Sequence, residues 1–361
     1  MNIEEERKEA ARLKASGLTT GQIADRMGLS RHAARRRLRY SDPAIEAAMD
    51  AVGTGMVPST VWVKTGTHSV MLRPEVDTTS VAEAMRDALD GMSAIEPVEP
   101  PNHTESDLLT CYTLADVHMG MMAWGKETGE DYDTHIASDR VKKWISHCVS
   151  QAPASDEALI LDVGDLTHAD DQKNMTPGSG HILDVDTRHF RTVDVTIKTI
   201  AAAIEIALTK HSTVRIRIMR GNHDCNTYIA IMFALAERYR NEPRVDVIKD
   251  PMDFFVHVWG QVMIGAHHGD KDKAQSLVLH MADRFADLWG QTRWRFLFTG
   301  HLHNHKSQDI GGVTWEQLRA ITAKDAYAAG YPFSARSEMQ AITYHKDRGE
   351  VSRVRVSNWM E

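Results

Sequence analysis

The tetrapeptide Gly221-Asn222-His223-Asp224 follows residues 214–219, a run whose apolar side chains alternate with arginines. This alternation predicts a half-buried β-strand. An amide, an imidazole and a carboxylate placed directly after a strand are typical of a catalytic loop on a rigid scaffold. A simple turn, which uses Gly and Asn because they tolerate positive φ, also accounts for these four residues. The choice between the two depends on the rest of the chain.

Four more predicted strands end in polar residues. They cover residues 109–114, 158–161, 261–266 and 296–298. The segments that follow them are Asp116-Val117-His118, Gly164-Asp165-Leu166-Thr167-His168, His267-His268-Gly269-Asp270 and Gly300-His301-Leu302-His303. Helices are predicted between the strands, at residues 137–149, 193–210, 227–239 and 274–288. The alternation of strands and helices indicates an α/β layered domain.

Polar side chains at the carboxyl ends of strands in such a fold gather at one edge of the sheet. The candidate metal ligands at the five strand ends are Asp116, His118, Asp165, Asn222, His268, His301 and His303. His267 competes with His268 for the same role. This mixture of carboxylate and imidazole suits Mn, Fe or Zn better than Ca or Mg. Seven ligands can serve two divalent ions if one carboxylate bridges, and the net positive charge that remains, even with a bridging hydroxide, would attract a phosphate.

The overall composition excludes several classes of protein. The chain has 361 residues, a formal net charge of -8, 42% hydrophobic residues and 25% charged residues, as in ordinary globular proteins. Nucleic-acid binding would therefore need a local basic patch. Three scattered cysteines do not form a disulfide framework. Without a signal peptide or a long apolar run, a cytoplasmic protein is expected.

Residues 1–92 have a different pattern, in which helices are predicted at 3–15, 21–27 and 31–40 around a Gly-containing turn. This order is typical of a helix-turn-helix. The third helix carries Arg31, Arg35, Arg36, Arg37 and Arg39. Such a face suits contact with DNA phosphates and base edges, whereas simply solvated arginines, or arginines docked on an acidic domain, remain the alternatives.

A hairpin is predicted within residues 59–73, as a wing or as a dimerisation ribbon, so a homodimer is left open. Weaker helices are predicted at 43–51 and 78–92. Residues 93–107 contain clustered prolines and are expected to be a linker. The predicted domains are therefore 1–92 and 108–361.

The five motifs, in this order over roughly residues 108–310, resemble those of the calcineurin-like metallophosphoesterase family. The resemblance implies a four-layer α/β/β/α sandwich with two divalent ions, manganese most of all. It implies Asp116, His118, Asp165 and His303 as ligands of the first ion, and Asp165, Asn222, His268 and His301 as ligands of the second. His268 is preferred to His267 because the family's ligand precedes a glycine. His223 would be the catalytic histidine, and Asp224 would orient it.

The second motif looks like that of the family's double-strand-break-repair nucleases, in which the histidine at position 168 contacts the DNA phosphate. Protein phosphatases of the family usually have Asp-Arg-Gly there, and this chain does not. A helix-turn-helix joined to a phosphoesterase is also similar to phage-type repair exonucleases. The chain departs from the repair nucleases in its N-terminal accessory domain. The expected activity is DNA phosphodiester hydrolysis, and the alternatives are a phosphomonoesterase or cyclic-nucleotide phosphodiesterase and a non-catalytic DNA-binding regulator.

Overall fold

The structure, a computed structural model, describes residues 3–31, 33–34, 38, 61–65, 68–72, 94–330 and 336–358. The chain divides into two compact units, Met1–Ala82 and Glu83–Glu361. In the part of the chain that is described, no helix is both long enough and apolar enough to cross a bilayer.

The smaller unit begins with two helices, α1 (Ile3–Ala15) and α2 (Thr20–Met27), which confirm the two helices predicted there. Thr19 caps α2 in a reciprocal capping box with Gln22. Gly28 ends α2 in the left-handed conformation with φ of 66°. A small apolar cluster holds the helices together; its buried members are Ala10, Leu13, Ile23, Ala24 and Ala34.

The predicted third helix is described only in part, because residues 31, 33, 34 and 38 are helical and its other residues lie outside the described chain. Arg31 is exposed, whereas Arg35, Arg36, Arg37 and Arg39 lie outside the described residues. DNA contact by these arginines therefore stays a prediction.

Two strands, β1 (Val61–Thr65) and β2 (His68–Leu72), pair antiparallel with Thr65 opposite His68, which confirms the predicted hairpin. The helices predicted at 43–51 and 78–92 lie outside the described residues.

The larger unit contains a six-stranded sheet in the order β13-β12-β3-β4-β5-β6. Its strands are β3 (Glu105–Leu114), β4 (Ser155–Asp162), β5 (Thr213–Arg217), β6 (Val245–Val247), β12 (Glu338–His345) and β13 (Gly349–Ser357). Strands β3 to β6 run parallel, and β12 runs antiparallel to both β3 and β13.

A five-stranded sheet has the order β10-β11-β9-β8-β7. Its strands are β7 (Phe255–Trp259), β8 (Val262–Ala266), β9 (Trp294–Thr299), β10 (Lys306–Ile310) and β11 (Val313–Gln317). Strands β8, β9 and β11 run parallel.

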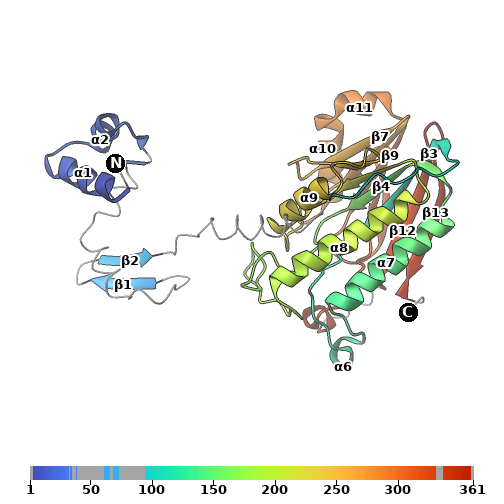
Figure 1. Cartoon of the computed structure of the whole chain (residues 1–361), viewed down its shortest axis with the longest axis horizontal. Coiled ribbons are helices and arrows are strands. Elements are labelled where there is room, and N and C mark those ends of the chain that lie inside the picture. The colour runs from blue at the N-terminus through green and yellow to red at the C-terminus, as the bar shows by residue number, and fades with distance from the viewer. Residues whose placement is uncertain are drawn as a thin grey trace. The chain divides into compact units, whose positions relative to one another are not determined.

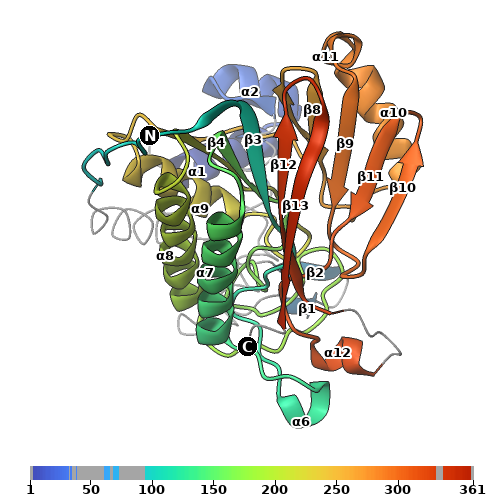
Figure 2. The ribbon, with the colours of Figure 1, turned by 90° about the vertical axis from the view of Figure 1, so that its right-hand side faces the viewer.

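Helices cover the outer faces of the two sheets (Figures 1 and 2). The six-stranded sheet is covered by α7 (Thr134–Gln151), α8 (His189–Leu208) and α9 (Thr227–Arg238). The five-stranded sheet is covered by α10 (Ala274–Arg284) and α11 (Ala286–Gln291). Two short helices, α6 (Gly125–Thr128) and α12 (Ala326–Ala329), contact each other. The expected four-layer α/β/β/α sandwich is confirmed.

Alternation along the central strands produces the layers, because successive side chains of a strand point to opposite faces. On β4, Leu159 and Leu161 pack between the two sheets, whereas Ala158 and Ile160 face the helices. On β9, Leu297 joins α10 in a third apolar cluster. A strand buried on both faces reads as a continuous apolar run, as these strands do.

The segment predicted as a linker is held to the larger unit where it is described. The amide of Ile95 donates to the Arg238 carbonyl at 3.1 Å, and the amide of Val98 donates to Glu242 Oε2 at 2.6 Å. The first strand of the larger unit, β3, begins at Glu105, four residues before the predicted start at Leu109.

Candidate metal centre

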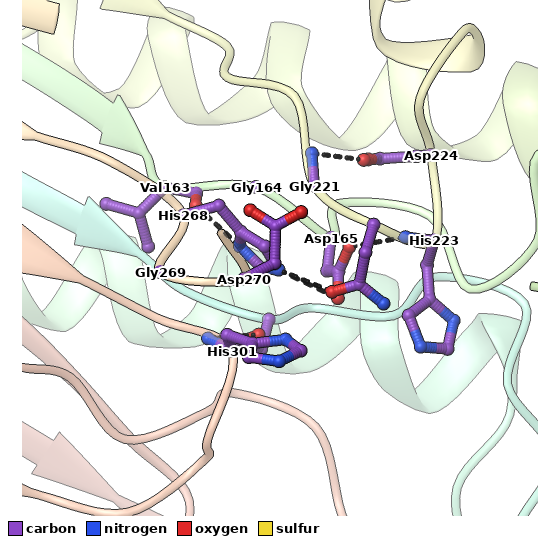
Figure 3. A network of polar contacts seen from close by, with 12 residues as sticks. Val163, Gly164, Asp165, Gly221, His223, Asp224, His268, Gly269, Asp270 and His301 are labelled. Atoms are coloured by element: carbon purple, nitrogen blue, oxygen red, sulfur yellow. Dashed lines mark hydrogen bonds and ion pairs between the residues drawn. The ribbon is translucent and has the colours of Figure 1, made fainter. Parts of the chain in front are cut away.

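The five polar segments meet at one edge of the sandwich because the strands before them run parallel within their sheets. Backbone hydrogen bonds tie the segments together. The amide of His118 donates to the Asp165 carbonyl at 2.9 Å, and the amide of Gly300 donates to the His268 carbonyl at 2.9 Å. Figure 3 shows four of these loops close to one another, labelled by Asp165, His223, His268 and His301.

One group of ligand atoms comes from Asp116, His118 and His303. The Nε2 atoms of His118 and His303 are 3.2 Å apart, and His303 Nε2 is 3.4 Å from Asp116 Oδ1. Asp116 and His118 are buried, whereas the side chain of His303 is 38% exposed. Asp116 and His118 are therefore shielded from solvent by the protein, and solvent reaches the group on the side of His303.

A second group comes from Asp165, His268 and His301. His268 Nε2 lies 3.2 Å from Asp165 Oδ2 and 3.0 Å from Asn222 Oδ1. The Nδ1–H of His268 donates to the Val163 carbonyl at 2.9 Å, which turns Nε2 toward Asp165 and Asn222. The structure therefore places Asn222 with this group.

Asp165 joins the two groups. Its Oδ2 atom is 3.8 Å from His118 Nε2 in the first group and 3.2 Å from His268 Nε2 in the second. Its Oδ1 atom accepts a hydrogen bond from the His223 amide at 2.8 Å, which holds the carboxylate in place. One carboxylate oxygen between two ligand groups is the arrangement that a bridging ligand requires.

The ligand candidates have an unusual backbone. Six non-glycine residues of the described chain have positive φ, between 47° and 69°, and five of them are ligand candidates. These five are Asp116, His118, Asp165, His301 and His303. Side chains are disfavoured in this left-handed region, and such residues concentrate at functional sites.

The protonation states fit a cation. Burial, together with the neighbouring His223, holds the pKa of His118 well below its ordinary value, so its imidazole is in the neutral form that binds metals. Burial opposes ionisation of Asp165, but the charge and hydrogen bond of His268 outweigh it and keep the pKa of this carboxyl well below its usual range. Burial lowers the pKa of His268, and the charge of Asp165 outweighs it and raises the pKa to about 10. A buried carboxylate that draws positive charge suits a divalent ion.

His223 lies beside both groups. Its Nδ1–H donates to the His168 carbonyl at 2.8 Å, so Nε2 is its free nitrogen. Its ring stacks on His168 at 5.2 Å and meets the His118 ring edge-on at 4.6 Å. This fixes the orientation of a partly exposed imidazole at the rim of the site.

His168 is buried behind His118, with their Nδ1 atoms 3.1 Å apart. Because His118 Nε2 faces His303, its Nδ1–H is left to donate to His168, which thus orients a candidate ligand. The phosphate contact that the resemblance implies for His168 stays a prediction.

The hydrogen bonds of Asp224 and of the His223 imidazole go to different partners, so the structure does not bring these two side chains together. Asp224 is buried, and its carboxylate accepts hydrogen bonds from backbone amides of two loops. Its Oδ1 accepts from Gly221 at 2.8 Å, and its Oδ2 accepts from Leu166 at 2.8 Å and Thr167 at 3.2 Å. A short carboxylate in the loop after β5 satisfies buried amides more readily than it reaches the imidazole of the preceding residue. Asp224 therefore fixes the loop of Asp165 against the loop of Asn222.

His267 is not part of either group of candidate ligands. His267 accepts a hydrogen bond from the Gly269 amide at 2.9 Å and lies near the Phe254 ring, whereas His268 faces Asp165. An ion pair that the sequence pattern does not predict, between Arg220 and Asp270 at 3.1 Å, ties the Asn222 loop to the His268 loop. Their position beside the two motifs was the available signal.

No protein-family model matches the sequence, and no curated protein matches it. Solved structures with a similar fold include an uncharacterised protein of Streptococcus pneumoniae described as a predicted phosphoesterase, at 12% identity and a TM-score of 0.30, covering 70% of this chain and 100% of that chain. An archaeal phosphodiesterase matches at 13% identity and a TM-score of 0.35, over 69% of this chain and 99% of that one. A dimetal phosphatase of Danio rerio matches at 11% identity and a TM-score of 0.33, over 69% of this chain and 98% of that one. At these identities, and with TM-scores below 0.5, the matches carry no conclusion about this chain.

Proposed function

We propose that this protein hydrolyses phosphodiester bonds with two divalent metal ions, and that its substrate is DNA. The observation that carries the proposal is the position of Asp165, whose single Oδ2 atom lies 3.8 Å from His118 Nε2 in one ligand group and 3.2 Å from His268 Nε2 in the other. A pair of ions that share one carboxylate is a recurrent device for phosphoester hydrolysis.

The residues fit such a pair of ions. Two carboxylates, four imidazoles and one amide supply hard and intermediate donors, which favour Mn, with Fe and Zn as alternatives. The first ion would be held by Asp116, His118, Asp165 and His303, and the second by Asp165, Asn222, His268 and His301. When bound, the ions stabilise charge on the phosphoryl oxygens and activate a water molecule.

His223 is the candidate proton donor of the site, and one hydrogen bond fixes which of its ring nitrogens faces the substrate. Its Nδ1–H is held by the His168 carbonyl, so Nε2 is the nitrogen that can hold a proton for the leaving oxygen. Asp224 acts indirectly, by holding the Asp165 loop, and His168 also contacts His118.

The choice of DNA is supported by the N-terminal sequence pattern. Two short helices, a turn through Gly28 and a segment that begins at Arg31 follow the order of a helix-turn-helix. In a chain with a net charge of -8, arginines concentrated in one segment are the local basic patch that phosphate binding requires.

The test is hydrolysis of bis(p-nitrophenyl) phosphate beside p-nitrophenyl phosphate by the manganese-loaded full-length protein. We expect the diester to be preferred, and we expect His223→Ala to lower its hydrolysis about 100-fold or more. The exposed His103, changed to Ala, is the matched control and should leave the rate unchanged. Full activity of His223→Ala would contradict the assigned role, and preference for the monoester would favour a phosphatase.

DNA as the substrate is tested by removing residues 1–82, because the larger unit has apolar cores of its own. The shortened protein should hydrolyse the small diester normally but cleave DNA more slowly, with a difference that shrinks as salt rises. Equal DNA cleavage by both forms would contradict a role of residues 1–82 in DNA binding, and hydrolysis of the small diester without cleavage of DNA would favour small nucleotides as substrates. Binding to one DNA sequence without any hydrolysis would favour a non-catalytic regulator.

A further inference from the structure

A cavity of about 430 Å³ lies on the side of the five-stranded sheet that faces α10. The beginning of α10, the end of β9 and strands β10 and β11 line it. Its volume is in the range of small-molecule sites. The side chains that decide its chemistry are Lys273, Gln275, Leu302, Lys306, Gln308 and Trp315.

The cavity and the candidate metal centre share a wall. Gly269 and Gly300 line the cavity, and each is the chain neighbour of a ligand candidate, His268 or His301. The two segments lie against each other, since a Cβ atom on Gly269 would be 3.6 Å from the Gly300 carbonyl oxygen and 3.8 Å from His301 Cβ. Leu302, which also lines the cavity, stands between His301 and His303 and is 53% exposed. A substrate held at the metal centre therefore has this cavity as a direct neighbour.

The apolar part of the lining suits a flat ring. The Trp315 indole is half-buried, and its N–H donates to Thr299 Oγ1 at 3.1 Å, which fixes the ring. Leu277 and Leu302 add aliphatic surface. Aromatic and aliphatic walls of this kind accept nucleobases.

The polar part of the lining suits the edge of a base and a phosphate. Gln275 and Gln308 are exposed amides, each able to donate and accept hydrogen bonds as the edge of a base requires. Lys273 and Lys306 bring two positive charges. The one carboxylate among the described lining residues, Asp272, accepts a hydrogen bond from the Lys273 amide at 2.8 Å.

We propose that this cavity binds the nucleobase of a nucleotide whose phosphate lies at the metal centre, and that Lys273 and Lys306 meet the next phosphate along the strand. The proposal rests on the proposed phosphodiesterase activity and makes its substrate a nucleotide diester. A simple aryl or alkyl phosphate has neither a base edge for Gln275 and Gln308 nor a second phosphate for the lysines, so it should gain less from the cavity.

The test compares two diesters with the same leaving group, the p-nitrophenyl ester of thymidine 5′-phosphate and bis(p-nitrophenyl) phosphate. The manganese-loaded full-length protein should have a kcat/KM about tenfold higher for the thymidine ester. In the double variant Gln308→Ala, Lys306→Ala this advantage should disappear, mainly through KM, while the value for bis(p-nitrophenyl) phosphate changes less than about twofold. The exposed pair Gln291→Ala, Lys249→Ala is the matched control and should keep the advantage. Equal rates on both substrates in the unaltered protein, or equal losses in the double variant, would overturn the proposal.

Binding without turnover separates this proposal from the proposed function. Saturation-transfer NMR with thymidine, which has no phosphate, should give a signal in the unaltered protein that Gln308→Ala, Lys306→Ala removes. A missing signal, or one that survives the double change, rejects the base-binding cavity even where both diesters are cleaved. If neither diester is cleaved, the proposed function fails, and the thymidine signal still decides whether the cavity binds a base.

Discussion

At the scale of single residues, the site depends on side chains held in a costly backbone conformation. Asp116, His118 and Asp165 have φ of 48°, 47° and 57°. Each such residue costs of the order of 1–3 kcal/mol, which the surrounding contacts must offset. For Asp116 these contacts include the amide of His301, which donates to its Oδ1 at 2.9 Å. The fold therefore holds the candidate ligands in place before any ion binds.

A buried histidine that is not among the candidate ligands, His211, gives the protein a dependence on pH. His211 is fully buried, its Nε2 is 2.7 Å from the Tyr112 hydroxyl, and its Nδ1 is 2.9 Å from the Ser155 carbonyl oxygen. Burial, partly offset by the hydrogen bond to Ser155, lowers its pKa from 6.5 to about 4. Below pH 6.5 His211 binds a proton in the unfolded chain but stays neutral in the folded protein. The free energy of unfolding should therefore fall as the pH drops from 6.5 to 4.

We expect the protonation of His211 to lower the free energy of unfolding by about 3 kcal/mol at most, because each unit of pKa difference corresponds to about 1.36 kcal/mol. Denaturant unfolding of the unaltered protein and of His211→Gln at several pH values measures it. The variant should be less stable at pH 7, because it loses hydrogen bonds, but its stability should fall less steeply with acid. Parallel pH curves would show that His211 does not titrate in this way.

At the scale of elements, the loops after the strands hold one another. Asp224 links the β5 loop to the β4 loop through three backbone amides, and Asp162 accepts from the amides of Gly164 and Met219 at 3.3 and 3.1 Å. The pair Arg220–Asp270 adds the β8 loop. Because the loops share these contacts, a change in one should displace ligands in another.

Gly221 gives the most direct test of this coupling between loops. A Cβ atom there would be 2.0 Å from Asp165 Oδ1 and 2.2 Å from the Asp165 amide nitrogen. Gly221→Ala should therefore displace the shared carboxylate, lower the metal content below two ions and reduce diester hydrolysis about 100-fold or more. Elemental analysis and the chromogenic diester measure both effects.

Gly290→Ala is the matched control, since a Cβ atom on Gly290 meets nothing within 4 Å. It should retain both ions and full activity. If Gly221→Ala also kept two ions and its rate, Asp165 would not be the shared ligand.

At the scale of the whole molecule, the strands that lead into the site could be predicted because their apolar runs end in polar motifs. The short or polar strands could not. Strand β10 (Lys306–Ile310) is largely exposed and has no apolar alternation, and it is an edge strand that exists because it pairs with β11. Strand β12 lies beside β3 although more than 200 residues separate them, and no local pattern encodes such a pairing.

The same distinction holds for the site. The ligand candidates could be found because each sits in a short motif at a strand end. The role of Asp224 and the pair Arg220–Asp270 could not be read from the sequence, because they depend on how separate loops pack. The cavity beside the candidate metal centre depends likewise on α10 lying against β11, two elements that are not consecutive in the chain.

The central claim is that two ions share Asp165, and the electron paramagnetic resonance spectrum of the manganese-loaded full-length protein tests it most directly. Two ions about 3.5–4 Å apart should give an exchange-coupled signal at a content of two manganese ions per chain. The spectrum of one isolated ion, or of two uncoupled ions, would contradict the account.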